Sequence, residues 1–514
     1  MDRLHTTTLG DLLREQRRSR RLEVAVVDED TRLTYAQLDE RVNRLADALR
    51  TAGFAAGDRI LWLGQNSHRV FEAFLAAAKL GGALCPVNWR QSPAELAFVL
   101  EDAAARVVLW QEEEVGETVR AARALLADDS ARWIQHDGDG ADGYERFLES
   151  GAAVDHDFDV DPGSPVLQMY SSATSGRPNG ALLSHTGFLD QAIIQAWLME
   201  LDHTFVYLAS GALFHIWTFQ NMVNAFALGG KVVFTAKADA EEMCRLIDAE
   251  RCTHAMILQP TIEKILEVNA DRRYDLSSMR HNAGFPAWQE MTSRDESPYA
   301  HSPNGYGQTE VMGMFTYNAI APGTVGTHGR PHPLVQVRVF DPDGVEVPDG
   351  EVGEIVARGP TVMYGYWNRP DENAYRQDDG WHHTRDLGRR EPDGTISFVG
   401  PATQMVKSAA ENIFAAEVEG ALNSHPAVKE SAIIGVPDPK WVQNVKAIVV
   451  LHDGHTATAD ELIDHCRERI ASYKKPKTVE FTDALPRAGF AIDYRALDDR
   501  YGGGGYPGGT NRSA

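Results

Sequence analysis

The stretch from Tyr170 to His185 decides the fold and reads Tyr-Ser-Ser-Ala-Thr-Ser-Gly-Arg-Pro-Asn-Gly-Ala-Leu-Leu-Ser-His. It follows an apolar run at 166–170 that predicts a buried strand, and a second apolar run begins at Ala181. Small residues let backbone amides approach an anion closely, and hydroxyl groups add donors. The stretch therefore predicts a phosphate-binding loop between strands, with a solvated Ser/Gly turn as the alternative. It is not a Walker loop, because the Gly-Lys-Ser/Thr ending is absent.

This stretch resembles the phosphate loop of the adenylate-forming superfamily, which includes acyl-CoA synthetases, luciferases and peptide-synthetase adenylation domains. In that family the loop usually reads Tyr-Thr-Ser-Gly-Thr-Thr-Gly-x-Pro-Lys-Gly. Here Ala173 replaces a glycine and Asn179 replaces the lysine, and a neutral amide brings no charge to a triphosphate. The resemblance assigns ATP binding to five residues of the loop, with the metal also at Thr174: Ser171, Ser172, Thr174, Ser175 and Gly176.

Composition limits the classes of protein that this chain can be. Its 514 residues exceed one ordinary core, so at least two domains are expected. The formal charge of −24 argues against a nucleic-acid partner and requires any nucleotide pocket to be locally positive. No apolar run approaches the roughly 20 residues that span a bilayer, and residues 1–8 lack a signal pattern, so a cytoplasmic protein is expected. The cysteines lack zinc or disulfide spacing, and Cys244 and Cys252 are expected to be buried.

Strands and helices alternate along the first half of the chain. Residues 34–49 place apolar side chains on one helical face behind Thr34 as N-cap, and strands are expected near 59–63 and 83–87. This alternation predicts an α/β fold with a parallel, doubly wound sheet.

The resemblance covers about residues 10–500 and implies a division into domains. An N-terminal AMP-binding domain, 1–400, would hold the parallel doubly wound sheets and a small β subdomain. A small mobile α+β domain would follow at 401–500, and residues 501–514 read as a Gly-rich disordered tail.

The motif Tyr-Gly-Gln-Thr-Glu at 306–310 is intact relative to the family. The resemblance implies that Tyr306 stacks on adenine, that Thr309 reaches the α-phosphate and that Glu310 holds Mg²⁺. The resemblance also implies that Gly307 contacts the nucleotide. The backbone of Ala283 and Gly284 would face the adenine.

The Thr-Arg-Asp sequence at 384–386 stands where the family has Thr-Gly-Asp. The resemblance implies that Asp386 accepts hydrogen bonds from both ribose hydroxyls. Arg385 replaces the glycine, and would either supply the charge that Asn179 lacks or lie solvated in a loop. His382 and His383 are expected at the surface.

The residues expected on the acyl side of the site come after a strand-like segment at 205–208 in the sequence. A lone histidine is usually a packing residue, but the resemblance places His215 beside the acyl and CoA paths, with catalytic roles for His215, Thr309 and Glu310. Trp217 would shorten the pocket, which favours a compact or flat aromatic acid over a long fatty chain. The pocket would be lined by His215, Trp217, Phe285, Gly307 and Val311.

The family's hinge and C-terminal motifs are altered in this chain. Pro401 occupies the position where the family has an arginine, Gln404 replaces the family's hinge residue, and Ala409-Ala410 replace two glycines. Lys407 matches the family's lysine, and the resemblance implies that it contacts the cofactor. Alanine resists the positive φ that glycine pairs allow, so the thioester-forming arrangement is in doubt. Ala491 takes the position of the lysine that bridges carboxylate and α-phosphate, and losing such a group typically costs on the order of 10²–10³ in rate.

Three functions remain open from the sequence. The first is an ATP- and Mg²⁺-dependent ligase that activates a small carboxylic acid as acyl-AMP, with coenzyme A as a further acceptor left open. The second is a repurposed enzyme of secondary metabolism, such as a diazotase-like member joining nitrite to an arylamine. The third is a catalytically impaired protein that binds a nucleotide or acyl group. A homodimer is expected from the family.

Overall fold

The computed structural model describes residues 3–171, 178–281, 286–323, 325–341, 343–401, 405–408, 411–488 and 491–504. Most loop residues assigned to ATP (172–177), Ala283 to Phe285, Gln404 and the Ala409-Ala410 pair therefore lie outside the described residues. Residues 505–514 of the expected tail lie outside them as well.

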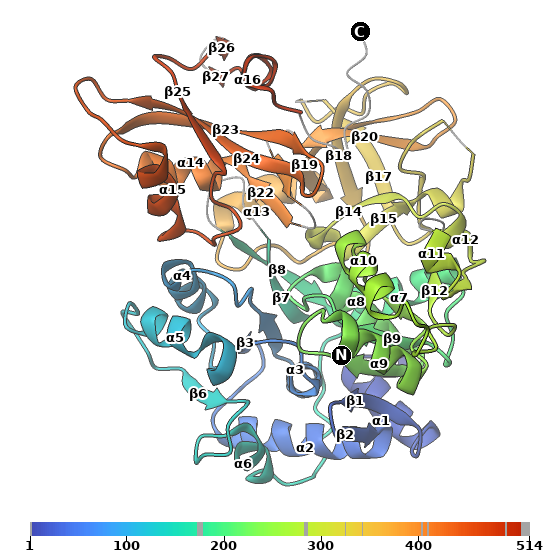
Figure 1. The fold of residues 1–514 in the computed structure, drawn as a ribbon. Helices are drawn as coiled ribbons and strands as arrows, with labels where there is room; N and C mark the ends of the chain where they lie inside the picture. The colour runs from blue at the N-terminus through green and yellow to red at the C-terminus, as the bar shows by residue number, and fades with distance from the viewer. Residues whose placement is uncertain are drawn as a thin grey trace.

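One six-stranded sheet carries the phosphate-loop hairpin (Figure 1). Its order is β6-β5-β3-β4-β7-β8, and all neighbours pair in parallel except β7 and β8, which are antiparallel. The strands are β3 (Arg59–Leu63), β4 (Ala83–Pro86), β5 (Val107–Trp110), β6 (Arg132–Gln135), β7 (Pro165–Ser171) and β8 (Asn179–Ser184). A parallel sheet with one antiparallel edge strand confirms the predicted α/β class.

A second sheet has the order β11-β9-β10-β1-β2 and is parallel except at β2. Its strands are β1 (Val24–Asp28), β2 (Thr31–Thr34), β9 (Val206–Ala209), β10 (Lys231–Phe234) and β11 (His254–Ala255). The last of these strands, β11, is short, and the chain leaves the sheet after Ala255. Cys244 and Cys252 are buried, as expected.

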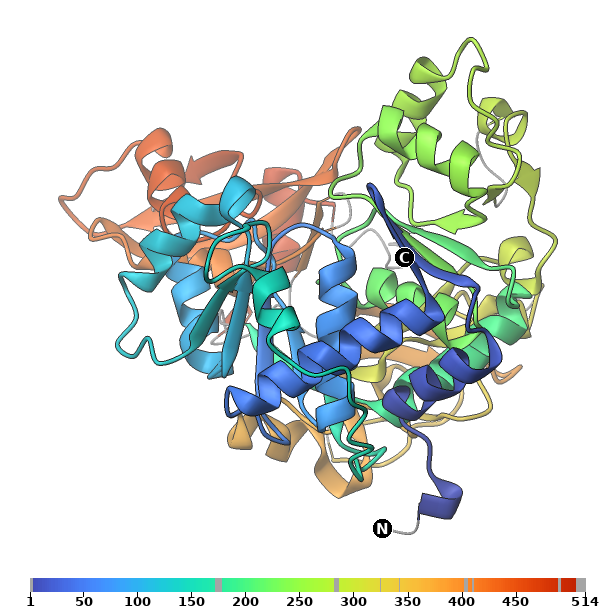
Figure 2. The ribbon, with the colours of Figure 1, turned by 90° about the horizontal axis from the view of Figure 1, so that it is seen from below.

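Helices α1, α2 and α3 pack together across the two sheets and share one apolar core (Figure 2). Helix α2 begins as predicted, because the Thr34 hydroxyl accepts a bond from the Gln37 amide while the Gln37 side chain accepts from Thr34. Helix α3 ends at Gly81, whose φ of +71° suits a glycine. The helices of this part are α1 (Leu9–Ser19), α2 (Tyr35–Thr51), α3 (His68–Leu80), α4 (Pro93–Ala103), α5 (Glu112–Arg123), α6 (Tyr144–Glu149), α7 (His185–Met199), α8 (Ile216–Ala227), α9 (Ala240–Glu250), α10 (Gln259–Val268), α11 (Pro286–Gln289) and α12 (Pro298–His301).

Smaller sheets follow, as the resemblance implied, and all of them are antiparallel except the parallel pair β12–β13. They bring the hairpin β14–β15 beside a four-stranded sheet of order β17-β18-β19-β20. The elements are β12 (Arg280–His281), β13 (Ser293–Arg294), β14 (Gly305–Gln308), β15 (Gly313–Tyr317), β16 (Arg330–Pro331), β17 (Gln336–Phe340), β18 (Gly353–Arg358), α13 (Pro370–Arg376), β19 (His382–Arg390) and β20 (Ile396–Pro401). The surface position expected for His382 is wrong: its side chain is buried in β19, and burial lowers its pKa to about 3.

The C-terminal part builds a sheet of its own, in which β24 lies between β23 and β25 and also contacts the hairpin β21–β22. A separate apolar cluster packs helices α14 and α15 on this sheet. The elements are β21 (Met405–Ser408), β22 (Glu411–Phe414), α14 (Ala415–Asn423), β23 (Val428–Asp438), β24 (Val442–Leu451), α15 (Ala459–Arg467), β25 (Thr478–Phe481), β26 (Arg487–Ala488), β27 (Ala491–Ile492) and α16 (Tyr494–Tyr501).

Candidate active site

The hairpin β7–β8 frames the predicted phosphate loop. Ser171 is the last residue of β7 and pairs directly with Asn179, the first residue of β8. Directly opposed residues of an antiparallel pair project to the same face, so both side chains flank the loop on one side. Ser172, Thr174, Ser175 and Gly176 remain predictions.

Glu310 lies beside this hairpin and is buried. Its Oε1 accepts hydrogen bonds from the Ser171 hydroxyl at 2.6 Å and from the Tyr366 hydroxyl at 2.7 Å. Two donors on one oxygen orient the carboxylate and leave Oε2 for a cation or donor. An anionic oxygen next to a phosphate loop fits Mg²⁺, which prefers carboxylate and phosphate oxygens. Sequence reasoning did not assign Tyr366 to the site and missed this contact.

Asp386 is held in place by two side chains of strand β14. The Tyr306 hydroxyl donates to its Oδ2 at 2.7 Å, and the Gln308 amide donates to the same oxygen at 2.5 Å. Burial raises the pKa of Asp386 to about 6, although Tyr306 and Gln308 oppose the shift. The buried Tyr306 ring stacks on Phe398, with centroids 5.2 Å apart. Tyr306 therefore positions Asp386, and its stacking on adenine stays a prediction.

An aromatic wall stands on the acyl side of the site. His215 caps helix α8, and its ring lies 4.9 Å from that of Phe214. Trp217 follows in the first turn, and its ring centroid is 6.0 Å from that of Tyr299. Tyr299 in turn meets Tyr317 edge-on at 6.3 Å. The structure thus joins Trp217 to two tyrosines that sequence reasoning did not assign.

Two further predicted pocket residues lie in the β14–β15 hairpin. Gly307 is exposed, whereas Val311 is fully buried in the cluster around Tyr306 and Phe315. A Cβ on Gly307 would approach the Gly313 carbonyl to 2.0 Å, so only glycine fits there. Thr309 begins a short 3₁₀ turn that carries Glu310 into the site.

The β21–β22 hairpin brings the C-terminal part onto His215. Glu411 pairs with Arg90 at 2.5 Å and lies 3.6 Å from His215 Nε2. Burial would raise the pKa of Glu411, but His215 and Arg90 outweigh it and lower the pKa to about 2. Lys407 lies on the neighbouring strand, and burial lowers its pKa. Ala491 lies in β27, at the edge of the C-terminal part remote from β14 (Figure 1).

Arg385 is neither in a solvated loop nor in contact with Asn179 through any hydrogen bond described below, and a role at the phosphate loop stays a prediction. Arg385 Nη2 pairs with Glu372 at 2.9 Å, and its guanidinium lies over the Tyr375 ring. Its φ of +56° explains why the family has glycine there. A different arginine, Arg369, donates its Nε to Asn179 Oδ1 at 2.9 Å.

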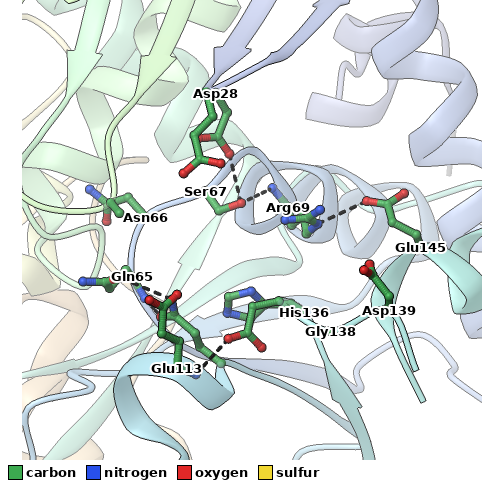
Figure 3. Close-up of a pocket in the computed structure, with 14 residues that line it drawn as sticks. Asp28, Gln65, Asn66, Ser67, Arg69, Glu113, His136, Gly138, Asp139 and Glu145 are labelled. Atoms are coloured by element: carbon green, nitrogen blue, oxygen red, sulfur yellow. Dashed lines mark hydrogen bonds and ion pairs between the residues drawn. The ribbon is translucent and has the colours of Figure 1, made fainter. Parts of the chain in front are cut away.

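A pocket of about 280 Å³ lies at the ends of strands β3, β5 and β6, next to Asp28 (Figure 3). Figure 3 shows Arg69 paired with Glu145 and carboxylates around His136. The excess of carboxylates would repel a polyphosphate, so this hollow does not compete as the nucleotide site. Within the described residues, no group of three or more His, Cys, Asp or Glu side chains could hold a metal by itself.

The fold and the Glu310–Asp386 arrangement define the class of an adenylate-forming enzyme. A family model described as "AMP-binding enzyme" matches residues 13–367, and one described as "AMP-binding enzyme C-terminal domain" matches residues 417–489. The chain belongs to this family.

Similar proteins of the family are acyl-CoA ligases and synthetases by name. Feruloyl-CoA synthase of an Amycolatopsis species is 36% identical over 470 residues, covering 89% of this chain and 92% of the relative. Indoleacetate–CoA ligase of Aromatoleum aromaticum is 34% identical, covering 88% and 90%. The solved o-succinylbenzoate CoA synthetase of Bacillus subtilis, bound to a product analogue, is 26% identical with a TM-score of 0.77 and covers 95% and 98%. The chain is therefore an adenylate-forming, acyl-CoA-synthetase-like ligase. None of its described helices is both long and apolar enough to cross a membrane.

Proposed function

We propose that this enzyme activates a flat aromatic carboxylic acid as its acyl-AMP and passes the acyl group to coenzyme A. The observation that carries the substrate class is the Trp217–Tyr299 wall beside His215. Planar rings favour offset or edge contacts with other rings, whereas a long alkyl chain gains nothing from them. The relatives that act on feruloyl and indoleacetyl groups support an aromatic acid.

The first half-reaction joins the acid to AMP. A carboxylate oxygen attacks the α-phosphorus of ATP, and the bond to the bridging oxygen of pyrophosphate breaks. Asp386 binds the ribose hydroxyls, and Tyr306 offers its ring to the adenine. Thr309 would donate to the α-phosphate, and Glu310 would hold Mg²⁺, which would neutralise polyphosphate charge when bound. Ser171 and Tyr366 keep that carboxylate in one orientation.

The second half-reaction transfers the acyl group. The thiol sulfur of coenzyme A attacks the acyl carbonyl carbon, the bond to AMP breaks and the thiol proton is released. His215 is proposed to lie beside the acyl carbonyl when the thiol attacks, and the Glu411 carboxylate 3.6 Å from its Nε2 supports this by orienting the ring. Lys407 on the same hairpin is proposed to contact AMP.

The remaining assignments stay proposals with their own checks. The domain boundary at residue 400 predicts that limited proteolysis cuts between the AMP-binding domain and the C-terminal domain. A homodimer predicts about twice the 56.7 kDa chain mass in light scattering. A cytoplasmic location and a role in secondary metabolism are proposed from the family alone.

The test of function is AMP release from Mg-ATP with a panel of carboxylic acids, with and without coenzyme A. We expect AMP and an acyl-CoA product with hydroxycinnamic or arylacetic acids, and little with hexadecanoic acid. A matched tube with nitrite and an arylamine tests the diazotase-like function, which the relatives do not favour. If no reaction releases AMP while the protein still binds ATP, the remaining function is that of a nucleotide-binding protein without catalysis.

A further inference from the structure

Residues 88–95, which lead into helix α4, contact the C-terminal part of the chain (Figure 1). The Asn88 side-chain amide donates to the Tyr473 hydroxyl at 3.2 Å. The Ser92 hydroxyl donates to the Arg469 carbonyl at 3.2 Å. These hydrogen bonds hold the C-terminal part against the N-terminal end of α4.

Lys474 joins the two parts of the chain at this contact and is buried. Its ammonium donates to Glu417 Oε1 at 2.5 Å and to Glu95 Oε1 at 3.3 Å. Glu417 lies in the first turn of α14, in the C-terminal part, whereas Glu95 lies in the first turn of α4. Burial would lower the pKa of Lys474, but the Glu417 carboxylate outweighs burial and raises the pKa, so the ammonium is charged at neutral pH. One buried cation therefore bonds to carboxylates from both parts.

The Glu95 carboxylate is oriented by the cap of its own helix. Its Oε2 accepts hydrogen bonds from the Ser92 amide at 2.9 Å and from the Ser92 hydroxyl at 3.0 Å, which completes a capping box. The other oxygen, Oε1, faces Lys474. The cap therefore fixes the direction of the carboxylate that receives the lysine.

The contact at Lys474 also bears on the geometry around His215. Helix α14 follows directly after β22, the strand that brings Glu411 to within 3.6 Å of His215. Because these two elements are consecutive, holding Glu417 in the first turn of α14 also holds the end of β22. Charge-assisted hydrogen bonds are strong, so this restraint is a firm one. Glu95 therefore acts on His215 indirectly, through Lys474 and the β21–β22 hairpin.

We propose that Glu95 and Lys474 are positioning residues for the transfer of the acyl group to coenzyme A, because their contact holds the C-terminal part where Glu411 meets His215. The inference rests on the proposed function, in which His215 serves this second half-reaction. Since both residues act through the hairpin, the first half-reaction is expected to proceed without their contact.

The test resolves the two half-reactions by rapid quench, with 4-hydroxycinnamic acid, Mg-ATP and coenzyme A. Glu95→Gln keeps an oxygen for the Ser92 cap but turns an amide NH₂ toward Lys474, so the bond between the two parts is lost. We expect thioester formation to slow by about tenfold, because a small misplacement of reacting groups costs that much, while acyl-AMP formation stays within about twofold. The KM for the carboxylic acid should not change.

Glu101→Gln is the matched control on the same helix. Glu101 is exposed, and its carboxylate accepts a hydrogen bond from the Ala127 amide at 3.0 Å. Both half-reactions should keep their wild-type rates in this variant.

A second variant removes the lysine without leaving a buried charge. Lys474→Met combined with Glu417→Leu exchanges a buried ion pair for apolar side chains, which proteins often tolerate. This double variant should slow thioester formation as much as Glu95→Gln does. Adding Glu95→Gln to it should cause no further loss, because the two positions act through one contact.

Hydrogen exchange reports the contact independently of activity. The backbone amides of residues 88–95 should exchange faster in Glu95→Gln and in the double variant than in the wild type. Exchange of strand β3, in the core of the six-stranded sheet, should stay unchanged and shows that the variants are folded.

Equal slowing of both half-reactions would overturn the proposal, as would wild-type thioester formation in Glu95→Gln and the double variant. A further loss on adding Glu95→Gln, or unchanged exchange at residues 88–95, would overturn it too. Failure of the proposed function looks different: the wild type would form no acyl-CoA from any acid, and the positioning role would fall with it. Exchange at residues 88–95 would then still respond to both variants.

Discussion

At the scale of single residues, Asp386 combines a functional gain with a cost in stability. Burial raises its pKa to about 6, so the folded protein holds the proton more tightly than the unfolded chain. Stability therefore falls as the pH rises from about 4 to about 6, and the full penalty, about 3 kcal/mol at most, is present above pH 6. Strained or desolvated groups at binding sites often carry such a cost.

Asp386→Asn is expected to stabilise the protein without nucleotide, because an amide oxygen still accepts from Tyr306 and Gln308 and no buried charge remains. Calorimetric melting at pH 8 should show a higher midpoint than the wild type, and at pH 4.5 the gain should shrink to about a third of its value at pH 8. ATP affinity should fall by about tenfold or more, since the bidentate acceptor for the ribose is lost. Equal gains in midpoint at both pH values would contradict the assignment.

Trp217 is expected to set the length of the acyl pocket. Trp217→Gly should lower kcat/KM for an aromatic acid by about tenfold or more and raise it for octanoic acid, because ring contact is exchanged for space. Trp110, which packs in a different cluster around β5, gives a control variant of the same type. A preference for aromatic acids that survives Trp217→Gly would mean that other groups select the substrate.

At the scale of elements, the β21–β22 hairpin is expected to serve the second half-reaction and not the first. Its Glu411 contacts Arg90 and His215, whereas the described side-chain hydrogen bonds of Glu310 and Asp386 come from residues outside the hairpin. The hairpin reaches His215 despite the Ala409-Ala410 sequence beside it, although those two residues lie outside the described part.

Glu411→Gln should therefore slow thioester formation by about tenfold while leaving acyl-AMP formation within about twofold. Rapid-quench measurements resolve the two steps, with Glu461→Gln on the remote helix α15 as the control. A uniform loss in both steps would indicate that the pair with Arg90 serves only to hold the two parts of the chain together.

At the scale of the whole molecule, the C-terminal part carries position 491 away from the nucleotide site (Figure 1). A lysine there can assist adenylation only if this part turns about the connection near residue 400. Ala491→Lys is expected to raise the rate of AMP release, by up to about 10²-fold if the family's lysine role applies here. No gain, in a variant with wild-type ATP affinity, would indicate that adenylation in this enzyme does not use a cation at position 491.

Much of the fold was predictable from local signals. The capping box at Thr34 and the apolar runs around residues 170 and 181 place a helix and two strands where the structure has them, because caps and periodicity act within a few residues. His382 shows the limit: a polar residue pair in a motif suggested the surface, and strand pairing buried one of the two.

The sequence by itself determined the α/β class, the adenylate-forming family, and the chemical types at Glu310, Asp386 and His215. The tertiary structure decided which residues act on these. Arg369 reaches Asn179 across 190 residues of chain, Tyr366 reaches Glu310 across 56, and Tyr299 reaches Trp217 across more than 80. Such contacts depend on sheet register and strand order, which carry no local signature in the chain.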